Sequence, residues 1–224
     1  MASVVEVWRY PVKSMAGERL DACAVSAAGL EGDRRWALVD GTPNRAGKLL
    51  TIREEEGLMR YRARLDGGSV EVVAPDGETH RLDAGVVSRI AGEASRPLTL
   101  REHEGANFDD SPVLVVNLAT VSAFGLRAGM PVDHRRFRAN LYVDGLAPDE
   151  EVDWLGRRLQ VGEVELEAVK RCERCVVITR DPDTTVTTPA LLRVLTESYE
   201  TYMGVYCQVT RPGRVAVGDQ LQLG

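Results

Sequence analysis

Residues 159–169, LQVGEVELEAV, carry the pattern that decides the fold class of this chain. Apolar and polar side chains alternate strongly along this stretch. A period of two is typical of a β-strand that buries one face, because successive side chains point to opposite sides of a sheet. The stretch therefore predicts strand structure immediately before the most unusual chemistry of the chain, which begins at Arg171.

Short strands with similar patterns are predicted along most of the chain. They cover residues 3–10, 20–26, 34–40, 70–73, 79–82, 112–116 and 215–223. Residues 70–73 and 79–82 should pair as a hairpin, and residues 215–223 should form another. Such evenly spaced short strands favour a barrel or a curled sheet.

Helices should be few and short. The candidates are residues 86–92, 118–126, 152–155 and 189–199, the last with Pro189 near its start and apolar side chains at helical spacing. We therefore expect a mainly β fold (β-rich α+β) of two interlocked β-barrel-like lobes with a few short helices. The boundary between the two parts should lie near residues 102–106, which gives 1–105 and 106–224.

Composition excludes several classes of protein. The chain has 224 residues and a net charge of -6, with no basic face that would bind nucleic acid. No apolar stretch approaches the length of a membrane-spanning helix, so no membrane partner is expected. The N-terminus lacks the features of a signal peptide, and four cysteines without a disulfide framework favour a reducing compartment. We expect a cytoplasmic protein.

Residues 171–184, RCERCVVITRDPDT, place two thiols among three arginines. The β-branched run at 176–179 predicts a strand after Cys175, and the Asp-Pro-Asp sequence predicts a turn. Positive neighbours lower the pKa of a thiol and favour the thiolate that ligates metals, while arginine recognises phosphate. The segment therefore offers a soft ligand and anion-binding groups together.

Several interpretations of Cys172 and Cys175 are open. A thioredoxin-like redox pair is disfavoured because that motif usually opens a helix, whereas a strand is predicted here. A structural zinc site is disfavoured because Cys23 and Cys207 are solitary and distant. A single thiolate that ligates a soft metal on an anionic cofactor is the third interpretation. The spacing does not rank it above two partly buried cysteines without a function.

Basic residues also gather in other loops beside predicted strands. Each would alone be interpreted as surface charge, as would the loop that contains Lys13 and Ser14. In an acidic chain, however, loops that converge at one barrel mouth would suit an anionic, phosphorylated ligand. The further basic positions are Arg34, Arg35, Arg53, Arg135, Arg136 and Arg138. Residues 109–112 could bind a cation or cap a turn, and the turn is the preferred interpretation.

Taken together, these motifs resemble the MOSC family, named after the C-terminal domain of molybdenum cofactor sulfurases. The resemblance extends from end to end, with an N-terminal β-barrel region (1–105) followed by the MOSC domain (106–224). Within the family, the pattern is most similar to the amidoxime-reducing components and their bacterial relatives. The motifs are YPVKS (10–14), GDRRW (32–36), DSP (110–112), FRAN (137–140), RCERC (171–175), GVY (204–206) and VGD (217–219).

The resemblance implies a pyranopterin molybdenum cofactor (Mo-molybdopterin) whose metal takes Cys175 as its protein ligand. It also implies that Ser111 contacts the cofactor and that seven residues hold the pterin and phosphate. These seven are Lys13, Ser14, Arg34, Arg53, Arg138, Asn140 and Arg174. The chain departs from the family pattern at Thr185, where glycine is common, at Ala139, where proline is common, and at residues 116–119.

The activity implied by the resemblance is reduction of N-hydroxylated or N-oxide small molecules, a detoxification reaction. Electrons should come from a separate ferredoxin- or flavin-type protein, because the chain shows no flavin or iron–sulfur motif. Pyridoxal phosphate and haem are not expected either. Two alternatives are a cofactor-binding or sulfur-carrier module with a persulfide on Cys175, and a protein that binds another anion without metal.

Overall fold

The computed structural model describes all residues from 1 to 224 and is rich in strands, as predicted. An eight-stranded sheet forms its centre, in the order β16-β12-β13-β14-β10-β11-β1-β2. These strands are β1 (Ser3–Arg9), β2 (Glu18–Leu20), β10 (Val113–Asn117), β11 (Leu141–Asp144), β12 (Arg158–Val161), β13 (Val164–Glu173), β14 (Tyr202–Arg211) and β16 (Leu221–Leu223). All neighbours are antiparallel except β10 and β11.

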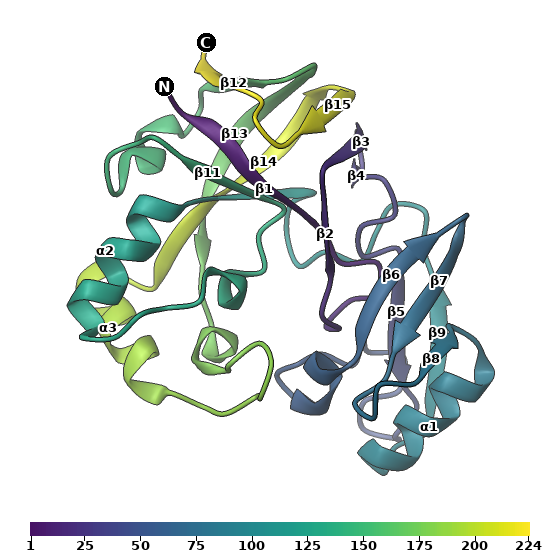
Figure 1. Cartoon of the computed structure of the whole chain (residues 1–224). Helices are drawn as coiled ribbons and strands as arrows, with labels where there is room; N and C mark the ends of the chain where they lie inside the picture. Colours follow the sequence, from purple (N-terminus) through teal and green to yellow (C-terminus); the bar gives the residue numbers. More distant parts are fainter.

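A smaller lobe carries two further sheets and one helix. Figure 1 shows it at the lower right, beside the large sheet. Its elements are β5 (Trp36–Asp40), β9 (Leu98–Glu102), β6 (Arg62–Asp66), β7 (Ser69–Val73), β8 (Thr79–Arg81) and α1 (Ala84–Ala94). The predicted hairpin of β7 and β8 is confirmed. Fourteen buried residues, among them Leu38, Tyr61 and Ile90, form the core of this lobe.

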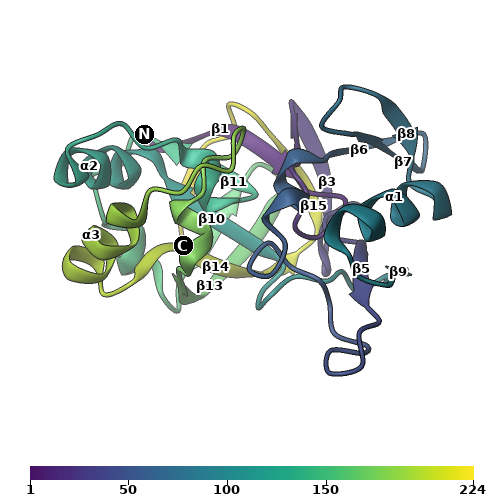
Figure 2. The same ribbon diagram turned by 90° about the horizontal axis from the view of Figure 1, so that it is seen from below.

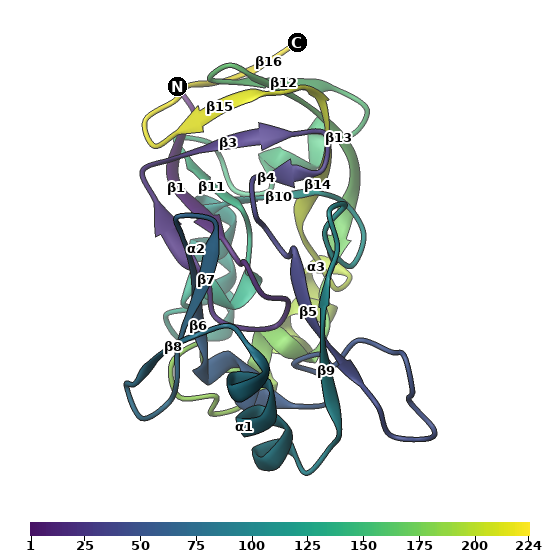
Figure 3. The same cartoon turned by 90° about the vertical axis from the view of Figure 1, so that its right-hand side faces the viewer.

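The two lobes are interlocked rather than arranged one after the other. The N-terminal strands β1 and β2 complete the sheet that the C-terminal half builds. A third, small sheet joins β3 (Ala22–Ser26) to β4 (Gly29–Leu30) and to β15 (Gly213–Ala216) near the end of the chain. Figure 3 shows β3 and β15 side by side at the top of the molecule. Both ends of the chain therefore take part in one folded unit.

Helices α2 (Leu118–Ala128) and α3 (Pro189–Tyr199) lie together at the end of the molecule opposite α1 (Figure 2). The residues predicted as helix at 189–199 match α3, whose buried Leu191, Leu195 and Tyr199 face the core. Asn117 begins α2 by accepting a hydrogen bond from the backbone of Ala119, which satisfies one of the free N–H groups of the first turn.

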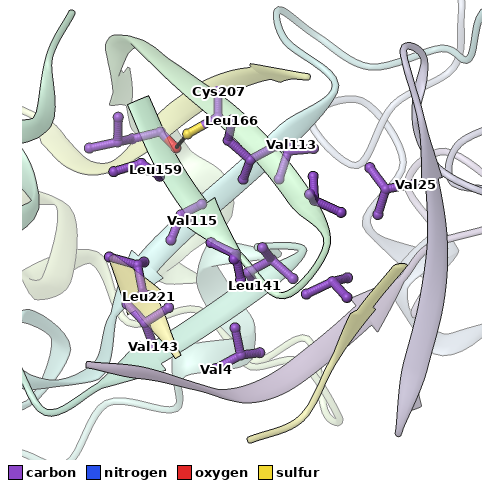
Figure 4. Packing of buried hydrophobic residues seen from close by; sticks show 14 of the residues in the cluster. Val4, Val25, Val113, Val115, Leu141, Val143, Leu159, Leu166, Cys207 and Leu221 are labelled. Carbon is purple, nitrogen blue, oxygen red and sulfur yellow. Dashed lines mark hydrogen bonds between the residues drawn. The ribbon is translucent and has the colours of Figure 1, made fainter. Parts of the chain in front are cut away.

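The largest hydrophobic core fills the space inside the curled eight-stranded sheet. Twenty buried residues form it, and Figure 4 shows Val4, Val115 and Leu141 among them. A second cluster, which includes Phe124 and Phe137, lies between the other face of this sheet and the helices. The central strands β10 and β11 are thus buried on both faces, and they are a rigid support for the loops that leave them.

Three local predictions are wrong. Residues 176–179 form a short 3₁₀ helix (Val176–Thr179) instead of a strand. The reason is that no strand lies beside them, and β-branched residues do not make a strand without a partner to pack against. Residues 215–223 do not form a hairpin, because β15 pairs with β3 while β16 pairs with β12. The strand predicted at 20–26 is interrupted at Asp21.

The remaining 3₁₀ helices are Glu56–Arg60, His134–Phe137 and Glu150–Trp154, the last of which overlaps the single turn of helix predicted at 152–155. None of the helices has the length and apolar character needed to cross a membrane.

Candidate functional site

All nine residues proposed as cofactor or metal contacts line one cavity, although they are far apart in the sequence. Lys13 and Ser14 follow β1, Arg34 precedes β5, and Arg53 precedes the Glu56–Arg60 helix. The others come from loops at the large sheet, and they are Ser111, Arg138, Asn140, Arg174 and Cys175. The cavity therefore combines loops of both lobes.

Three of these residues have a left-handed backbone, which is uncommon outside glycine. Their φ angles are 74° at Ser14, 50° at Arg34 and 53° at Arg138. Such a conformation costs roughly 1–2 kcal/mol per residue and persists only where the surroundings enforce it. At Arg34 the backbone N–H donates to the carbonyl of Tyr10 at 2.7 Å. The strained backbone at these three positions thus directs their side chains toward the cavity.

Arg34 and Arg138 are held on the ring of Tyr10. Their Cζ atoms lie 4.9 Å and 4.5 Å from the ring centroid, within the range of cation–π attraction. Arg34 also pairs with Asp33 and donates to the carbonyl of Arg138 at 3.1 Å, while Arg138 donates to the carbonyl of Met15 at 2.8 Å. Burial lowers the pKa of Arg138 to about 10, which still leaves it charged at neutral pH.

Lys13 and Arg53 share one carboxylate at the rim of the cavity. Lys13 Nζ lies 2.6 Å from Asp109 Oδ1, and Arg53 Nη2 lies 3.0 Å from Oδ2. Burial raises the pKa of Asp109, but the two cations outweigh it and lower that pKa to about 2. Burial also lowers the pKa of Lys13, an effect that Asp109 opposes. From the sequence, Asp109 was interpreted as part of a turn, with cation binding as the alternative.

The two cysteines of the RCERC segment have different surroundings. Cys172 is buried, and Arg174 Nη1 donates to its sulfur at 2.9 Å. Cys175 is half-buried and forms the N-terminal cap position of the Val176–Thr179 helix. The nearby Cys175 thiol is the largest cause that raises the pKa of Arg53. Both thiols line the cavity, and Cys175 is the more exposed of the two.

These surroundings bear on the alternatives for the thiol pair. Both thiols are free, and no group of three or more His, Cys, Asp or Glu side chains is placed to hold a metal ion. A structural zinc site therefore lacks ligands. The strand predicted after Cys175, which disfavoured a redox pair, is wrong, because a 3₁₀ helix follows this residue.

Asn140 and Ser111 line the cavity, but other parts of the protein already hold their side chains. The amide of Asn140 accepts from the backbone of Leu114 at 3.1 Å and donates to the carbonyl of Trp8 at 3.3 Å. The hydroxyl of Ser111 donates to Asp110 at 3.0 Å. In this arrangement Asn140 ties β1 to β10 beneath the arginines.

Sequence reasoning missed several residues of the site. Tyr10 supports two arginines, and Tyr206 on β14 lines the cavity together with Cys172. Burial is the largest cause of the raised pKa of Tyr206. Both tyrosines belong to motifs that carry the family resemblance, and that was the available signal. Glu173, between the two cysteines, also lines the cavity.

The cavity is small at its base and opens outward. Its inner part has a volume of about 110 Å³. It shares Arg53, Asp109, Glu173 and Tyr206 with a wider adjoining hollow of about 570 Å³. Together the two spaces have the size of an ordinary small-molecule site.

The comparisons with known proteins identify the family. The MOSC domain matches residues 100–222, and the MOSC N-terminal beta barrel domain matches residues 1–110. The chain belongs to the MOSC family. Mitochondrial amidoxime-reducing component 1 of Homo sapiens is 25% identical over the whole chain and 83% of its own length. The Bos taurus component 2 is 24% identical over 98% of the chain and 82% of its own length.

Two further proteins are similar to this MOSC chain, one in sequence and one in fold. The molybdenum cofactor sulfurase of Caenorhabditis elegans is 34% identical over 93% of the chain, but this covers 33% of the sulfurase. The crystal structure of the YUAD protein from Bacillus subtilis has the same fold, with a TM-score of 0.56 over the whole chain and 96% of that protein, at 15% identity. The family is associated with the molybdenum cofactor.

The residues present fit such a cofactor. Five cations line the cavity against two carboxylates, Asp109 and Glu173, so the cavity favours an anion. The buried Nε of Arg174 has no hydrogen-bond partner within the protein, although a buried donor of this kind normally has one. The thiol of Cys175 is a soft donor beside these cations. The donor set therefore suits a phosphorylated group that carries a thiophilic metal.

Proposed function

We propose that this MOSC protein is a molybdenum-cofactor-dependent oxidoreductase that reduces N-hydroxylated or N-oxide compounds. The observation that carries the proposal is the convergence of five cations and an accessible thiol on one cavity. The similarity to amidoxime-reducing components along the whole chain supports it. We propose the cytoplasm as its location and a separate ferredoxin- or flavin-type protein as its electron donor.

The residues of the chain have distinct parts in this proposal. Cys175 is the protein ligand to molybdenum, and the basic residues with Ser14 and Ser111 hold the pterin and phosphate. Phe137, Ile178 and Leu114 form an apolar wall that limits water at the base of the cavity. When bound, the cofactor supplies the two-electron chemistry.

The overall reaction determines how many electrons and protons must reach the site. An N–OH compound takes up two electrons and two protons, its N–O bond breaks, and the products are the N–H compound and water. The electrons come from the partner protein and the protons from solvent. Because the wider hollow connects the cavity with the surface, both substrate and protons have a path to the site.

The test separates the two cysteines. We expect Cys175→Ser to lose bound molybdenum and all benzamidoxime reduction with reduced viologen as donor. Cys172→Ser should keep at least part of both, because Cys172 is buried behind Arg174. The loaded wild-type protein should use viologen but not NADH alone, and a partner reductase should restore NADH dependence. Full activity in Cys175→Ser with loss in Cys172→Ser would refute the assignment.

The second candidate function is a cofactor-binding or sulfur-carrier module with a persulfide on Cys175. The accessible thiol beside Arg53 and the likeness to a molybdenum cofactor sulfurase favour it. Protein that holds molybdenum but shows no turnover with any electron donor would support this candidate over the reductase.

A further inference from the structure

The segment that joins β9 to β10 carries a buried asparagine beside the cavity. Asn107 lies in this segment, and its exposed fraction is 4%. It does not line the cavity itself, but two cations that do, Lys13 and Arg34, both hydrogen-bond it. Burial of a polar side chain costs free energy unless its groups find partners. The partners of Asn107 therefore indicate what its burial achieves.

Asn107 fixes the backbone on both sides of Arg34. Its N–H donates to the Arg34 carbonyl at 2.7 Å, and its Nδ2 donates to the same oxygen at 2.9 Å and to the Arg35 carbonyl at 3.1 Å. Its Oδ1 has no partner within the protein, so the amide acts through its donors. A carbonyl oxygen accepts two hydrogen bonds, and Asn107 alone supplies both to Arg34. Because the N–H of Arg34 is bonded to Tyr10, both adjoining peptide groups are held, and the left-handed φ of 50° persists.

The main chain of the same segment holds Lys13. Lys13 Nζ donates to the carbonyl oxygen of Asn107 at 2.5 Å, and its other partner is Asp109, two residues further along. The side chain of Lys13 is buried, so these two acceptors take the place of water around the ammonium group. One short stretch of chain, residues 107–109, therefore determines where two cations of the cavity lie.

Lys13 and Arg34 are close enough to repel each other. Burial is the largest cause that lowers the pKa of Lys13, and the positive charge of Arg34 adds to the decrease. Two like charges move apart unless the surrounding structure holds them. When they are held together, they can bind one anionic group without reorganisation, and such preorganisation raises affinity. The pair therefore needs a rigid support on the side away from the cavity.

We propose that Asn107 is a positioning residue that holds Lys13 and Arg34 together for one anionic group, the phosphate of a bound cofactor. Asn107 does not touch the anion and acts only through the two cations. The inference rests on the proposed function for the identity of the anion, whereas the positioning itself needs only an anion in the cavity. Because Asn107 belongs to the segment between the lobes, this segment is part of the binding machinery as well as a connection.

The first experiment measures anion binding without turnover. The probe is inorganic pyrophosphate, titrated by calorimetry into the full chain purified without cofactor. Asn107→Ala removes both hydrogen bonds of the amide and should weaken pyrophosphate binding roughly 10-fold, the size expected when charge-assisted contacts lose their support. Asn107→Ser should lie between this variant and the wild type, because its hydroxyl can donate to one carbonyl. Equal binding by all three proteins, or no binding by the wild type, would overturn the proposal.

The matched control is Asn117→Ala. Asn117 is also buried, its Nδ2 also donates two hydrogen bonds, at 2.8 Å to Ala147 and 3.0 Å to Glu151, and it does not line the cavity. Both Ala variants should lose stability in urea, but Asn117→Ala should bind pyrophosphate like the wild type. Equal weakening of binding in the two variants would show that Asn107 contributes stability alone, and would refute its positioning role.

A double-mutant cycle tests whether Asn107 acts through Lys13. Lys13→Met keeps a long side chain but removes the charge. In this background Asn107→Ala should weaken pyrophosphate binding less than it does in the wild type, because one of the two cations that it positions is absent. Strictly additive effects of the two substitutions would contradict the proposal, since a general loss of stability does not depend on Lys13.

The outcomes also separate this inference from the proposed function. Pyrophosphate binding that depends on Asn107, in a protein that holds molybdenum but reduces no amidoxime, would refute the proposed function and leave the positioning role established. Amidoxime reduction by a protein whose pyrophosphate binding is the same with and without the Asn107 amide would refute the positioning role and leave the function intact.

Discussion

Asp109 determines how available two of the site's cations are. Its carboxylate lies between Lys13 and Arg53, so an incoming phosphate group competes with it for the same donors. The other cations of the cavity are directed differently. Arg34 and Arg138 lie on Tyr10, and Arg174 donates to Cys172 and to the carbonyl of Phe137. A change at Asp109 therefore affects the anion affinity of the cavity through two cations, whereas a change at Lys13 or Arg53 affects it through one.

We expect Asp109→Asn to bind inorganic pyrophosphate more tightly than the wild type, by about 5-fold, a value near 1 kcal/mol for one partly exposed ion pair. The gain should stay constant between pH 5 and 8. With a pKa of about 2, Asp109 is fully ionised in this range, and its competition would fade only as the pH fell toward 2. Calorimetry at several pH values provides the measurement.

Asp110→Asn is the control, because Asp110 pairs with Lys170 outside the inner cavity. Weaker pyrophosphate binding in Asp109→Asn would show that Asp109 holds Lys13 and Arg53 in position rather than competing with the ligand.

The residues that line the site could be predicted from the sequence, but the contacts that hold their side chains in place could not. Cations beside predicted strands, and the match to family motifs, led to Lys13, Arg34 and Cys175. Nothing local indicates that Tyr10 supports Arg138, since 128 residues separate them and the contact exists only after folding. The same holds for Asn140, whose amide is engaged by β1 and β10.

At the scale of elements, the close approach of β14 to β10 depends on a glycine. Gly204 has a φ of +81°, and an added Cβ would lie 2.7 Å from Val116 Cγ2 and 2.9 Å from the carbonyl oxygen of Val115. Both neighbours belong to a buried central strand that cannot move away easily. Tyr206 lies two residues further along β14, so this approach also sets the wall of the cavity.

We expect Gly204→Ala to lower the free energy of unfolding by about 2–4 kcal/mol, because backbone strain and overpacking add. Gly129→Ala is the control. Gly129 also has a positive φ of +68°, but an added Cβ would meet nothing within 4 Å, so strain alone should cost about 1 kcal/mol. Urea denaturation of both variants measures the difference, and equal losses would contradict the packing argument.

Elements that depend on residues close in the sequence could be predicted, whereas elements that depend on distant partners could not. Helix α3 is specified by its own residues, with Pro189 in the first turn and three buried apolar residues at helical spacing. The structure of residues 176–179 and 215–223 is not specified locally, because a strand forms only where another strand lies beside it. Residues 176–179 have no neighbouring strand, and 215–223 divide between two sheets. Pairing over such distances is set by the whole fold.

At the scale of the whole molecule, the interlocked lobes bear on the proposed division at residues 105 and 106. This division stays a prediction. A cut there would separate β1 from β11 and β3 from β15, although it would leave the core of the small lobe within one fragment. The large sheet would lose β1 and β2, which stand together at one end of its strand order, and exposed strand edges promote association.

We expect the fragment 106–224 expressed alone to aggregate or to unfold without a cooperative transition. Co-expressed with a tagged fragment 1–105, it should co-purify and regain a cooperative urea transition, because β1 and β3 then return to their partners. Circular dichroism and a pull-down give the readout. A lone 106–224 fragment with the midpoint of the full chain would show that the N-terminal strands are dispensable.

The position of β1 also has a consequence during synthesis. Val7 pairs with Leu141, and the backbone of Leu221 donates to the carbonyl of Ala2 at 2.9 Å. At roughly 10 residues per second on a ribosome, the first strand waits on the order of ten seconds for its partner to be translated. The nascent chain exposes the β11-facing edge of that strand for the whole interval, because only β2 is translated early enough to pair with it. Slow translation and high temperature should therefore reduce the yield of this protein before any mature molecule exists to be destabilised.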